Sequence, residues 1–476
     1  MKRVAWIILV ALLVGPGLWA QASSPAGTAG GTQGAAGGGS SSTDNGEGDF
    51  FGSGDVEAKQ GTAEKQNPAE AVEGEKLGFS GQLQALSNYT MTRNFVQGNA
   101  GLSDNSFANA VIGDFFLDAR LPRSFRTFLD LNITYVPTGA LVPVTFTGVF
   151  PGAGPLPSTL TLAQTQTTVL DIREVFVDFN FSDNALHFRA GKQVLKWGTG
   201  YFWNPTDLIN IQHKSFTNLS ATIDGVFGLR TDVTFSPNFH LYTFIDLNGV
   251  TDLTDIAYAA RTEFLAGTVE FGFSGWYQYN ASNQVPVFGA DLTMPLFWEL
   301  NLTGEASFAW GDPVQKQDPN STLPYWVQNQ PVAKVDVGLS RTFDVLNVQD
   351  RMTVMAEFFW NSDGYSQNML QVPGFELGYF HPGYYGQYYG ALFISINDFG
   401  LQNMTLSLNG LMNFSDTSAI ALVGLSDSPV NNFTLQVQLG SYLGPNVAEY
   451  TTAYNSLNNA LISNQFFVIL SAQVNF

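Results

Sequence analysis

The sequence predicts an all-β protein, a transmembrane antiparallel β-barrel of about eighteen strands, with sixteen strands as the next count. Three observations lead to this fold class. From residue 77 onward, short segments alternate apolar and polar residues with a period of two. The connections between these segments alternate between long and short. Beyond the N-terminal region, no run of ~18 apolar residues could form a membrane-spanning helix.

The composition narrows the function classes before any motif is considered. The chain has 476 residues, enough for one large barrel or for two or three ordinary domains. It contains no Cys, which excludes disulfides, thiol chemistry and Cys metal sites. The net charge of −20 argues against nucleic-acid binding, which requires a basic face. Only 13% of residues are charged, while 48 are Gly and 39 are Phe, which favours a sheet with one face in lipid.

The first 76 residues precede the barrel and form two predicted segments. Residues 1–22 fit a secretory signal peptide, because Lys2 and Arg3 precede a short apolar stretch and Ala20 and Ala22 offer cleavage sites. An N-terminal membrane anchor is the alternative. Residues 23–76 are rich in Gly, Ser and Ala and then in charged residues, so they are predicted to be a disordered periplasmic tether. The barrel is expected to occupy residues 77–476.

Eighteen segments carry the period-two pattern and are predicted to be strands. In one of them, Leu302 and Phe308 share a face while Thr303 and Glu305 share the other. The predicted strands are residues 79–91, 109–120, 126–136, 169–181, 186–197, 223–235, 238–248, 256–265, 268–279, 285–294, 297–309, 332–343, 351–361, 387–397, 402–413, 417–426, 431–442 and 464–476.

The connections indicate the architecture more strongly than the strands do. Long connections follow odd-numbered strands, namely 92–108, 137–168, 198–222, 310–331, 362–386 and 443–463. Short turns follow even-numbered strands. This asymmetry is typical of outer-membrane barrels, which have long extracellular loops and short periplasmic turns. An even strand count then predicts both termini on the periplasmic side.

The last strand, 464–476, is expected to close the barrel. Leu470, Val474 and Phe476 lie on one face, and Ser471 and Gln473 lie on the other. Because a sheet in lipid has no open edge, this strand should pair with 79–91. It resembles the closing strand of bacterial outer-membrane barrels, whose terminal Phe is read by the barrel-assembly machinery. The resemblance implies that Phe476 is an assembly signal.

Polar residues of the strands are predicted to line a water-filled lumen, because eighteen strands leave a wide bore. Acidic residues outnumber basic ones in this lining, which predicts a pore that prefers cations or neutral solutes over anions. Structural ion pairs on the inner wall are the alternative role for these charges. The principal predicted lumen acids are Asp178, Asp232, Asp246, Glu299, Glu305, Asp336 and Glu357.

Residues 189–209 are the stretch with the most chemical character. A strand ends near Trp197, and a Gly-rich turn then opens a long loop that contains further aromatic residues. These side chains are predicted to lie at the pore mouth and contact a solute, or alternatively to belong to the interfacial aromatic girdle. The predicted contact residues here are Lys192, Gln193, Trp197, Tyr201, Trp203 and Asp207.

The same stretch resembles a Gly-basic-Gln…Trp-Gly segment of Gram-negative outer-membrane barrels that include alginate-export-type porins and related barrels of unknown function. The matching positions are Gly191, Lys192, Gln193, Trp197, Gly198, Asn204, Pro205 and Asp207. The resemblance covers ~20 residues and implies a porin-like barrel. In such barrels, loops on this side often fold inward and narrow the pore.

A second aromatic cluster at 375–389 includes Tyr384 and Tyr385, which could stack on a flat or apolar solute or pack within a loop. The four His residues show no metal-ligand spacing, and no Gly-rich phosphate loop is present. The sequence therefore predicts a non-enzymatic outer-membrane channel without cofactors, for passive uptake of small solutes. The alternatives are a fatty-acid-type hydrophobic transporter and a structural or adhesive surface barrel. Membrane lipid and the barrel-assembly machinery are the other expected partners.

Overall fold

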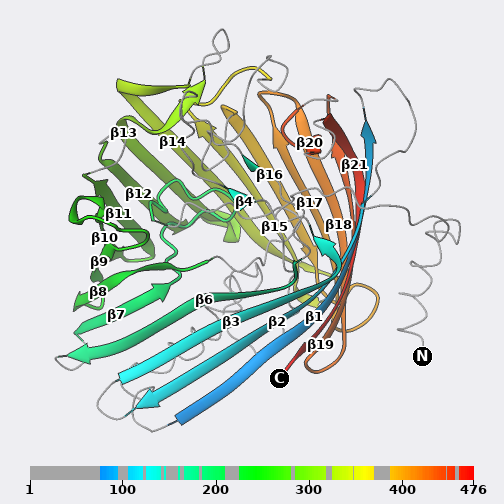
Figure 1. Ribbon diagram of the computed structural model, residues 1–476, viewed down its shortest axis with the longest axis horizontal. Coiled ribbons are helices and arrows are strands. Elements are labelled where there is room, and N and C mark those ends of the chain that lie inside the picture. The colour runs from blue at the N-terminus through cyan, green and yellow to red at the C-terminus, as the bar shows by residue number, and fades with distance from the viewer. Residues whose placement is uncertain are drawn as a thin grey trace, which may run out of the picture.

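The chain forms a β-barrel (Figure 1), seen here in a computed structural model. The structure describes residues 76–94, 106–121, 125–140, 144–145, 159–160, 166–181, 185–209, 224–279, 285–317, 324–346, 348–368, 386–445, 448–455 and 460–476. The predicted signal peptide 1–22 and the predicted tether up to residue 75 lie outside the described residues.

Eighteen described strands follow one another around the barrel. They are β1 (Lys76–Asn94), β2 (Ser106–Leu121), β3 (Phe125–Ala140), β6 (Gln166–Phe181), β7 (Leu186–Gln193), β8 (Val226–Ser236), β9 (Phe239–Asp246), β10 (Ala257–Ala266), β11 (Val269–Gln278), β12 (Val287–Pro295), β13 (Asn301–Gln317), β14 (Pro324–Val345), β15 (Val348–Asn361), β16 (Tyr388–Ile396), β17 (Met404–Asn413), β18 (Ser418–Val430), β19 (Phe433–Leu443) and β21 (Ala460–Asn475).

The barrel closes between its first and last strands. β1 pairs antiparallel with both β2 and β21, and each remaining strand of the set pairs antiparallel with its two neighbours. Leu83 lies opposite Val474, and the backbone N–H and C=O of Phe476 both bond to Gly81 at 2.9 Å. This closure satisfies the edge groups that lipid cannot. The predicted pairing of 79–91 with 464–476 and the predicted count of eighteen are therefore confirmed.

Several short elements lie outside the eighteen-strand wall. In the described residues, β20 (Thr452–Asn455) pairs with the N-terminal end of β21, and β4 (Val144–Thr145) pairs with β5 (Thr159–Leu160). The described residues also include two short 3-10 turns, η2 (Leu253–Asp255) and η3 (Phe297–Glu299). No helix in the described part of the chain has the length and apolar character needed to cross a membrane.

Most strand bounds shift by a few residues, and three of the differences have a clear structural cause. β7 ends at Gln193 instead of residue 197, because the chain leaves the wall there. β13 starts at Asn301 instead of residue 297, since the positive φ of Trp298 (61°) and Glu299 (58°) forms a turn. The connection predicted at 310–331 was too long, because β13 and β14 extend as a bulged hairpin to Gln317 and Pro324.

Side chains alternate between the two faces of the barrel wall as the period-two pattern predicts. On β21, Leu470 and Val474 are exposed while Ser471 and Gln473 are buried. The exposed face is largely apolar and includes a contact of Phe476 with Phe79 at 6.0 Å between ring centroids. An apolar belt on the outside of a closed sheet is the property of a barrel that spans a membrane.

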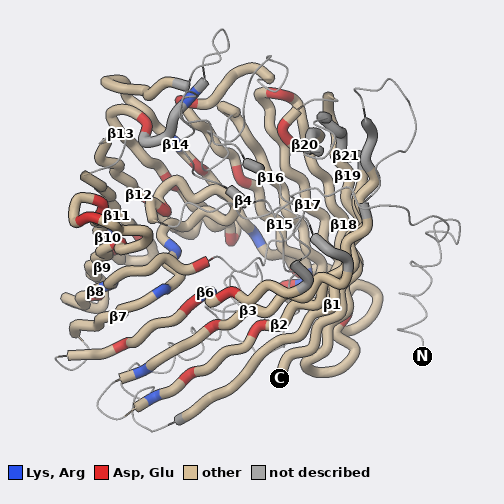
Figure 2. The backbone as a smooth tube through the Cα atoms, in the orientation of Figure 1, with Lys and Arg blue, Asp and Glu red and all other residues tan. Residues whose placement is uncertain are grey.

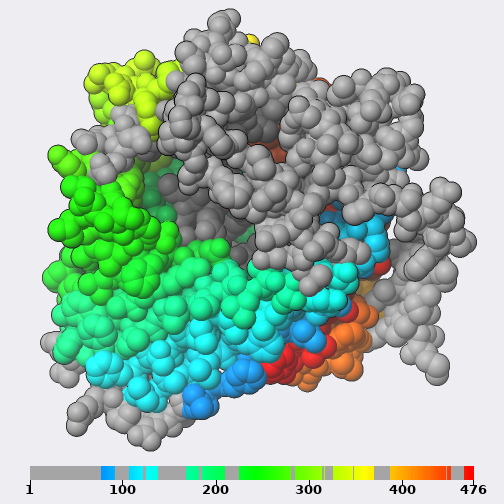
Figure 3. Space-filling model, viewed as in Figure 1, coloured from blue at the N-terminus to red at the C-terminus, as the bar shows by residue number. Residues whose placement is uncertain are grey.

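The interior is partly filled. A space-filling view shows a hollow bordered by the strands coloured teal to green, which include β7 to β12 (Figure 3). On the inner face of β15–β21, by contrast, large side chains such as Phe359, Phe393 and Phe467 form a buried apolar cluster. The strand count predicted a water-filled lumen instead of a packed core, and in the structure side chains of the barrel occupy part of that lumen.

Candidate functional site

A loop after β7 crosses the inside of the barrel. We call residues 194–209 the inward loop. It leaves the wall where the N–H of Val194 bonds to the Glu174 carboxylate at 2.7 Å. Its middle then contacts β13 and β15, which lie six and eight strands further round the wall of eighteen. Because half of the wall is nine strands, the inward loop spans most of the bore.

Two glutamates hold the middle of the inward loop. Glu305 of β13 accepts hydrogen bonds from the N–H groups of Thr199, Gly200 and Thr206 and from the Thr206 hydroxyl, the last at 2.8 Å. Glu357 of β15 accepts hydrogen bonds from the N–H groups of Tyr201 and Phe202, the latter at 2.7 Å. Hydrogen bonds to a carboxylate are about twice as strong as neutral ones. Five backbone N–H groups are thus satisfied by two buried side chains.

The glycines of the inward loop make this approach feasible. Gly198 has φ +94°, which favours Gly, and a Cβ there would overlap the Glu305 carboxylate. A Cβ on Gly200 would overlap the carbonyl oxygen of Trp203 and lie 3.0 Å from a carboxylate oxygen of Asp336. The Gly-rich turn therefore brings the backbone against the acids of the opposite wall.

Aromatic packing fixes the inward loop beside these hydrogen bonds. Trp203 is 0% exposed and stacks on Phe359 with ring centroids 5.6 Å apart and planes at 9°. It also lies 5.9 Å from Tyr389, while Tyr201 meets Phe393 edge-on at 4.9 Å. With both faces of its ring covered, Trp203 anchors the inward loop and has no surface for a solute in this state.

The carboxylates under the inward loop lie in register across neighbouring strands. Asp291, Glu305 and Asp336 are direct cross-strand partners on β12, β13 and β14. Arg261 binds Asp291 through two nitrogens, the longer contact being 2.9 Å. Asp336 is fully buried, and neither of its carboxylate oxygens has a hydrogen-bond partner in the described structure. The backbone of Gly200 lies against one of these oxygens.

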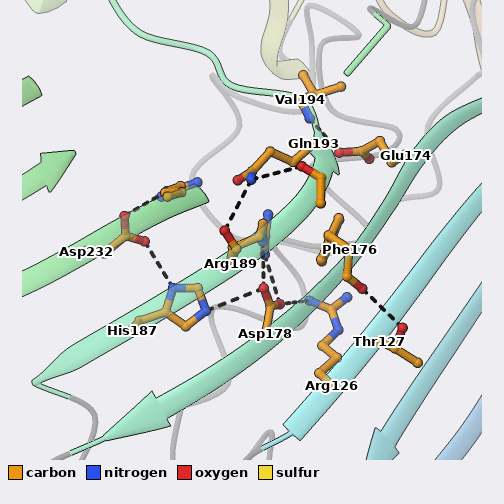
Figure 4. A network of polar contacts seen from close by, with 12 residues as sticks. Arg126, Thr127, Glu174, Phe176, Asp178, His187, Arg189, Gln193, Val194 and Asp232 are labelled. Atoms are coloured by element: carbon orange, nitrogen blue, oxygen red, sulfur yellow. Dashed lines mark hydrogen bonds and ion pairs between the residues drawn. The ribbon is translucent and has the colours of Figure 1, made fainter. Parts of the chain in front are cut away.

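A network of ion pairs occupies the wall of β3–β8 (Figure 4). Asp178 accepts two hydrogen bonds from Arg189, at 2.7 and 3.1 Å, and lies 3.6 Å from Arg126. His187 connects Asp178 to Asp232, with contacts of 3.6 and 3.2 Å. Figure 2 shows basic and acidic positions close together on neighbouring strands of this wall. Here the acids are balanced by side chains of the wall itself.

The remaining predicted site residues have varied positions. Gln193 is fully buried and donates to backbone carbonyls, including that of Gly228 at 3.4 Å. Lys192 donates to the carbonyl of Ile172 at 2.7 Å, and the N–H of Asp207 closes a turn on Asn204. Trp197 packs in a second buried cluster with Leu195, Val226, Phe244 and Ala259.

The other predicted site residues lie at the end of β9, in a turn, or outside the described residues. Asp246 lies on β9 and accepts the N–H of Asn248 at 2.8 Å. Glu299 was predicted to line the lumen. It lies instead in the turn η3, and its side chain is 82% exposed. Tyr384 and Tyr385 fall outside the described residues. Among the described residues, no three His, Asp or Glu side chains are arranged to bind a metal ion.

The prediction overlooked Arg173, and a β-bulge explains why. Asp130 pairs with Glu174 and Leu131 pairs with Ile172, so Arg173 is an extra residue in β6. The bulge lets both Arg173 and Glu174 reach the inner face, where Arg173 bonds to Asp114 at 2.7 Å. A strict period of two would place these neighbours on opposite faces.

Comparisons with known proteins find one family and several similar solved structures. A family model described as "Protein of unknown function (DUF1302)" matches residues 9–248. No curated protein matches the sequence. Similar solved structures include Acinetobacter baumannii OccAB4, with 9% identity, a TM-score of 0.48 and coverage of 84% of this chain and 98% of that chain. Pseudomonas aeruginosa OpdK with vanillate has 11% identity, a TM-score of 0.46 and coverage of 84% and 100%.

Proposed function

Since this chain belongs to the DUF1302 family, whose description assigns no function, we propose its function from the barrel itself. We propose that it is a porin-like channel through which small solutes pass passively, with the inward loop setting the width of the path. The observation that carries this proposal is the inward loop, held across the bore by Glu305 and Glu357. A barrel with only a structural or adhesive role has no need for an internal constriction.

The charge of the lining supports a preference for cations or neutral solutes. Among the buried charged side chains in the described part of the chain, eleven are acidic and three are basic. A lumen with excess negative charge raises the local concentration of cations and repels anions. The resemblance of residues 191–207 to alginate-export-type porins therefore does not extend, in this proposal, to export of an acidic polysaccharide.

The proposal also gives the protein a place and an orientation. The apolar outer face supports insertion in the outer membrane. Both chain termini would then lie on the periplasmic side. Export would use the signal peptide at 1–22, and residues 23–76 would form a periplasmic tether. Phe476 would be read by the barrel-assembly machinery. Its ring lies on the outer face beside Phe79 and Phe115, where a partner in the membrane can reach it.

Conductance in a planar lipid bilayer tests the proposed function. The refolded full-length mature chain should form channels, and the reversal potential under a KCl gradient should show cation selectivity. Anion selectivity would contradict the charge preference. A correctly folded barrel that conducts no ions would contradict the channel and favour a structural role.

A further inference from the structure

We infer that the lumen wall at the root of the inward loop binds organic cations that carry ammonium or guanidinium groups. The site consists of Asp130 on β3 and Glu174 on β6, with Asp171 at its outer rim. The inference deepens the proposed function, on which it rests, by naming a solute class and a binding position for it.

Two carboxylates are placed directly opposite each other on this wall. Asp130 and Glu174 are cross-strand partners, and their side chains are 1% and 2% exposed. Like charges in this relation repel, and the repulsion is stronger in a buried position than in water. The bulge at Arg173 creates the arrangement, because it shifts the register of β6 beside Asp130. A bound cation between the two carboxylates would remove the repulsion.

The basic residues nearby form their hydrogen bonds with other groups, although Arg173 also attracts the Asp130 carboxylate electrostatically. The guanidinium of Arg173 bonds to Asp114 at 2.7 Å. The amine of Lys192 donates to the carbonyl oxygen of Ile172 at 2.7 Å and lies 3.9 Å from Asp171. Glu174 accepts the N–H of Val194, whereas the Oδ1 atom of Asp130 is buried with no hydrogen-bond partner in the described structure. The unpartnered oxygen needs a hydrogen-bond donor, which an ammonium group supplies.

The site has an accessible edge. The side chain of Asp171 is 41% exposed and lies three residues before Glu174 on β6, which is roughly 10 Å along a strand. Burial and the nearby Asp171 carboxylate raise the pKa of Asp224, just before β8, so acids are crowded at this edge. Carboxylates spread over such a distance match an elongated molecule with two cationic ends. Asp336, whose two carboxylate oxygens also have no hydrogen-bond partner in the described structure, lies instead against the backbone of Gly200 in the inward loop.

A linear diamine tests this inference on the full-length barrel. Block of channel current by 1,5-diaminopentane is measured in the wild type and in Asp130→Asn, with 1,5-pentanediol as the neutral analogue of the same length. Asp246→Asn is the matched control, because it removes one acid from the inner face of β9, away from the site. Isothermal titration of the folded barrel in detergent with the same diamine measures binding independently of conductance.

We expect the diamine, and not the diol, to bind and to block the wild type. Asp130→Asn should weaken diamine binding about tenfold, the effect of losing one hydrogen bond to a charged group. Asp171→Asn should weaken it less, and Asp246→Asn should leave it unchanged. Equal effects of Asp130→Asn and Asp246→Asn would overturn the site and indicate only general lumen charge. A conducting barrel that binds no diamine would also overturn the site while leaving the channel intact. Diamine binding without conductance would support the site and contradict the channel.

Discussion

On β13 and β15, Glu305 and Glu357 accept hydrogen bonds from the backbone of the inward loop, whereas on β3–β8 the acids Asp178 and Asp232 are bound by Arg and His side chains. Both walls therefore place carboxylates on the inner face of a strand. One wall uses them to fix a loop across the bore, and the other balances them within the wall. The difference shows that an acidic residue facing the lumen can determine either the width or the lining of a pore, depending on its donor.

Replacing both loop-holding acids should have the largest effect on the pore. In the wild type, backbone N–H groups of the inward loop donate to the carboxylates of Glu305 and Glu357. In the double variant Glu305→Gln and Glu357→Gln, the amide NH2 groups would face these same N–H donors and could not accept from them. Loss of charge-assisted hydrogen bonds at about 1.5–3 kcal/mol each should release the inward loop and raise single-channel conductance. Glu299→Gln, in an exposed turn, is the matched control and should leave conductance unchanged. Equal conductance in the double variant and the wild type would contradict the role of Glu305 and Glu357 in setting the width of the pore.

Trp203→Ala should open the pore to a smaller extent, because the hydrogen bonds to Glu305 and Glu357 remain. Removing a fully buried Trp costs about 3–5 kcal/mol of stability. Here the loss weakens the packing of the inward loop against Phe359. Single-channel recordings should show higher and noisier conductance. Trp298→Ala removes a Trp that is 72% exposed and should change neither property. If Trp203→Ala changed solute block at constant conductance, Trp203 would contact solute and not anchor the loop.

Asp178→Asn addresses the opposite wall and should affect stability more than conductance. It leaves Arg189 buried without its bidentate partner, and breaking a buried ion pair costs about 3–5 kcal/mol. The temperature at which the barrel loses its heat-modifiable mobility on a gel should therefore fall. Asp350→Asn, with an exposed side chain, provides the comparison. A large rise in conductance in Asp178→Asn would mean that this wall also controls the bore.

The smallest expected effect is a pH dependence at Glu449, in the connection between β19 and β20. Burial, followed by repulsion from Asp416, raises the pKa of Glu449 to about 8, although Tyr389 and Asn413 donate hydrogen bonds to it. Because the pKa of Glu449 in the folded protein lies above its ordinary value of 4.5, the stabilising contribution is complete below pH 4.5 and is lost as pH rises through about 8. Tyr389 also packs against Trp203, so current noise should increase modestly between pH 6 and pH 9.

Glu449→Gln provides the test of this coupling, because the amide resembles the protonated acid at every pH. The variant should behave at pH 9 as the wild type behaves at pH 6. A wild-type increase in noise that persists unchanged in Glu449→Gln would assign the pH dependence to another group.

The repeating properties of the wall were predictable from the sequence. Alternation along each segment identified all eighteen strands, and the need to leave no open edge in lipid paired 79–91 with 464–476. These features depend on a local pattern and on one general property of the solvent. The lumen face of Asp178, Glu305 and Glu357 follows from the same parity.

Only the tertiary structure decided what the inner face binds. The contacts of Gly200 with Glu305 and of Tyr201 with Glu357 join residues 105 and 156 positions apart, and no local pattern encodes such pairs. The bulge at Arg173 shifts the parity of β6 and places Glu174 opposite Asp130, which alternation alone does not reveal. The sequence thus determined a closed wall, because that wall repeats a local rule. The path through it depends on where one loop crosses the bore and on which side chains meet it there.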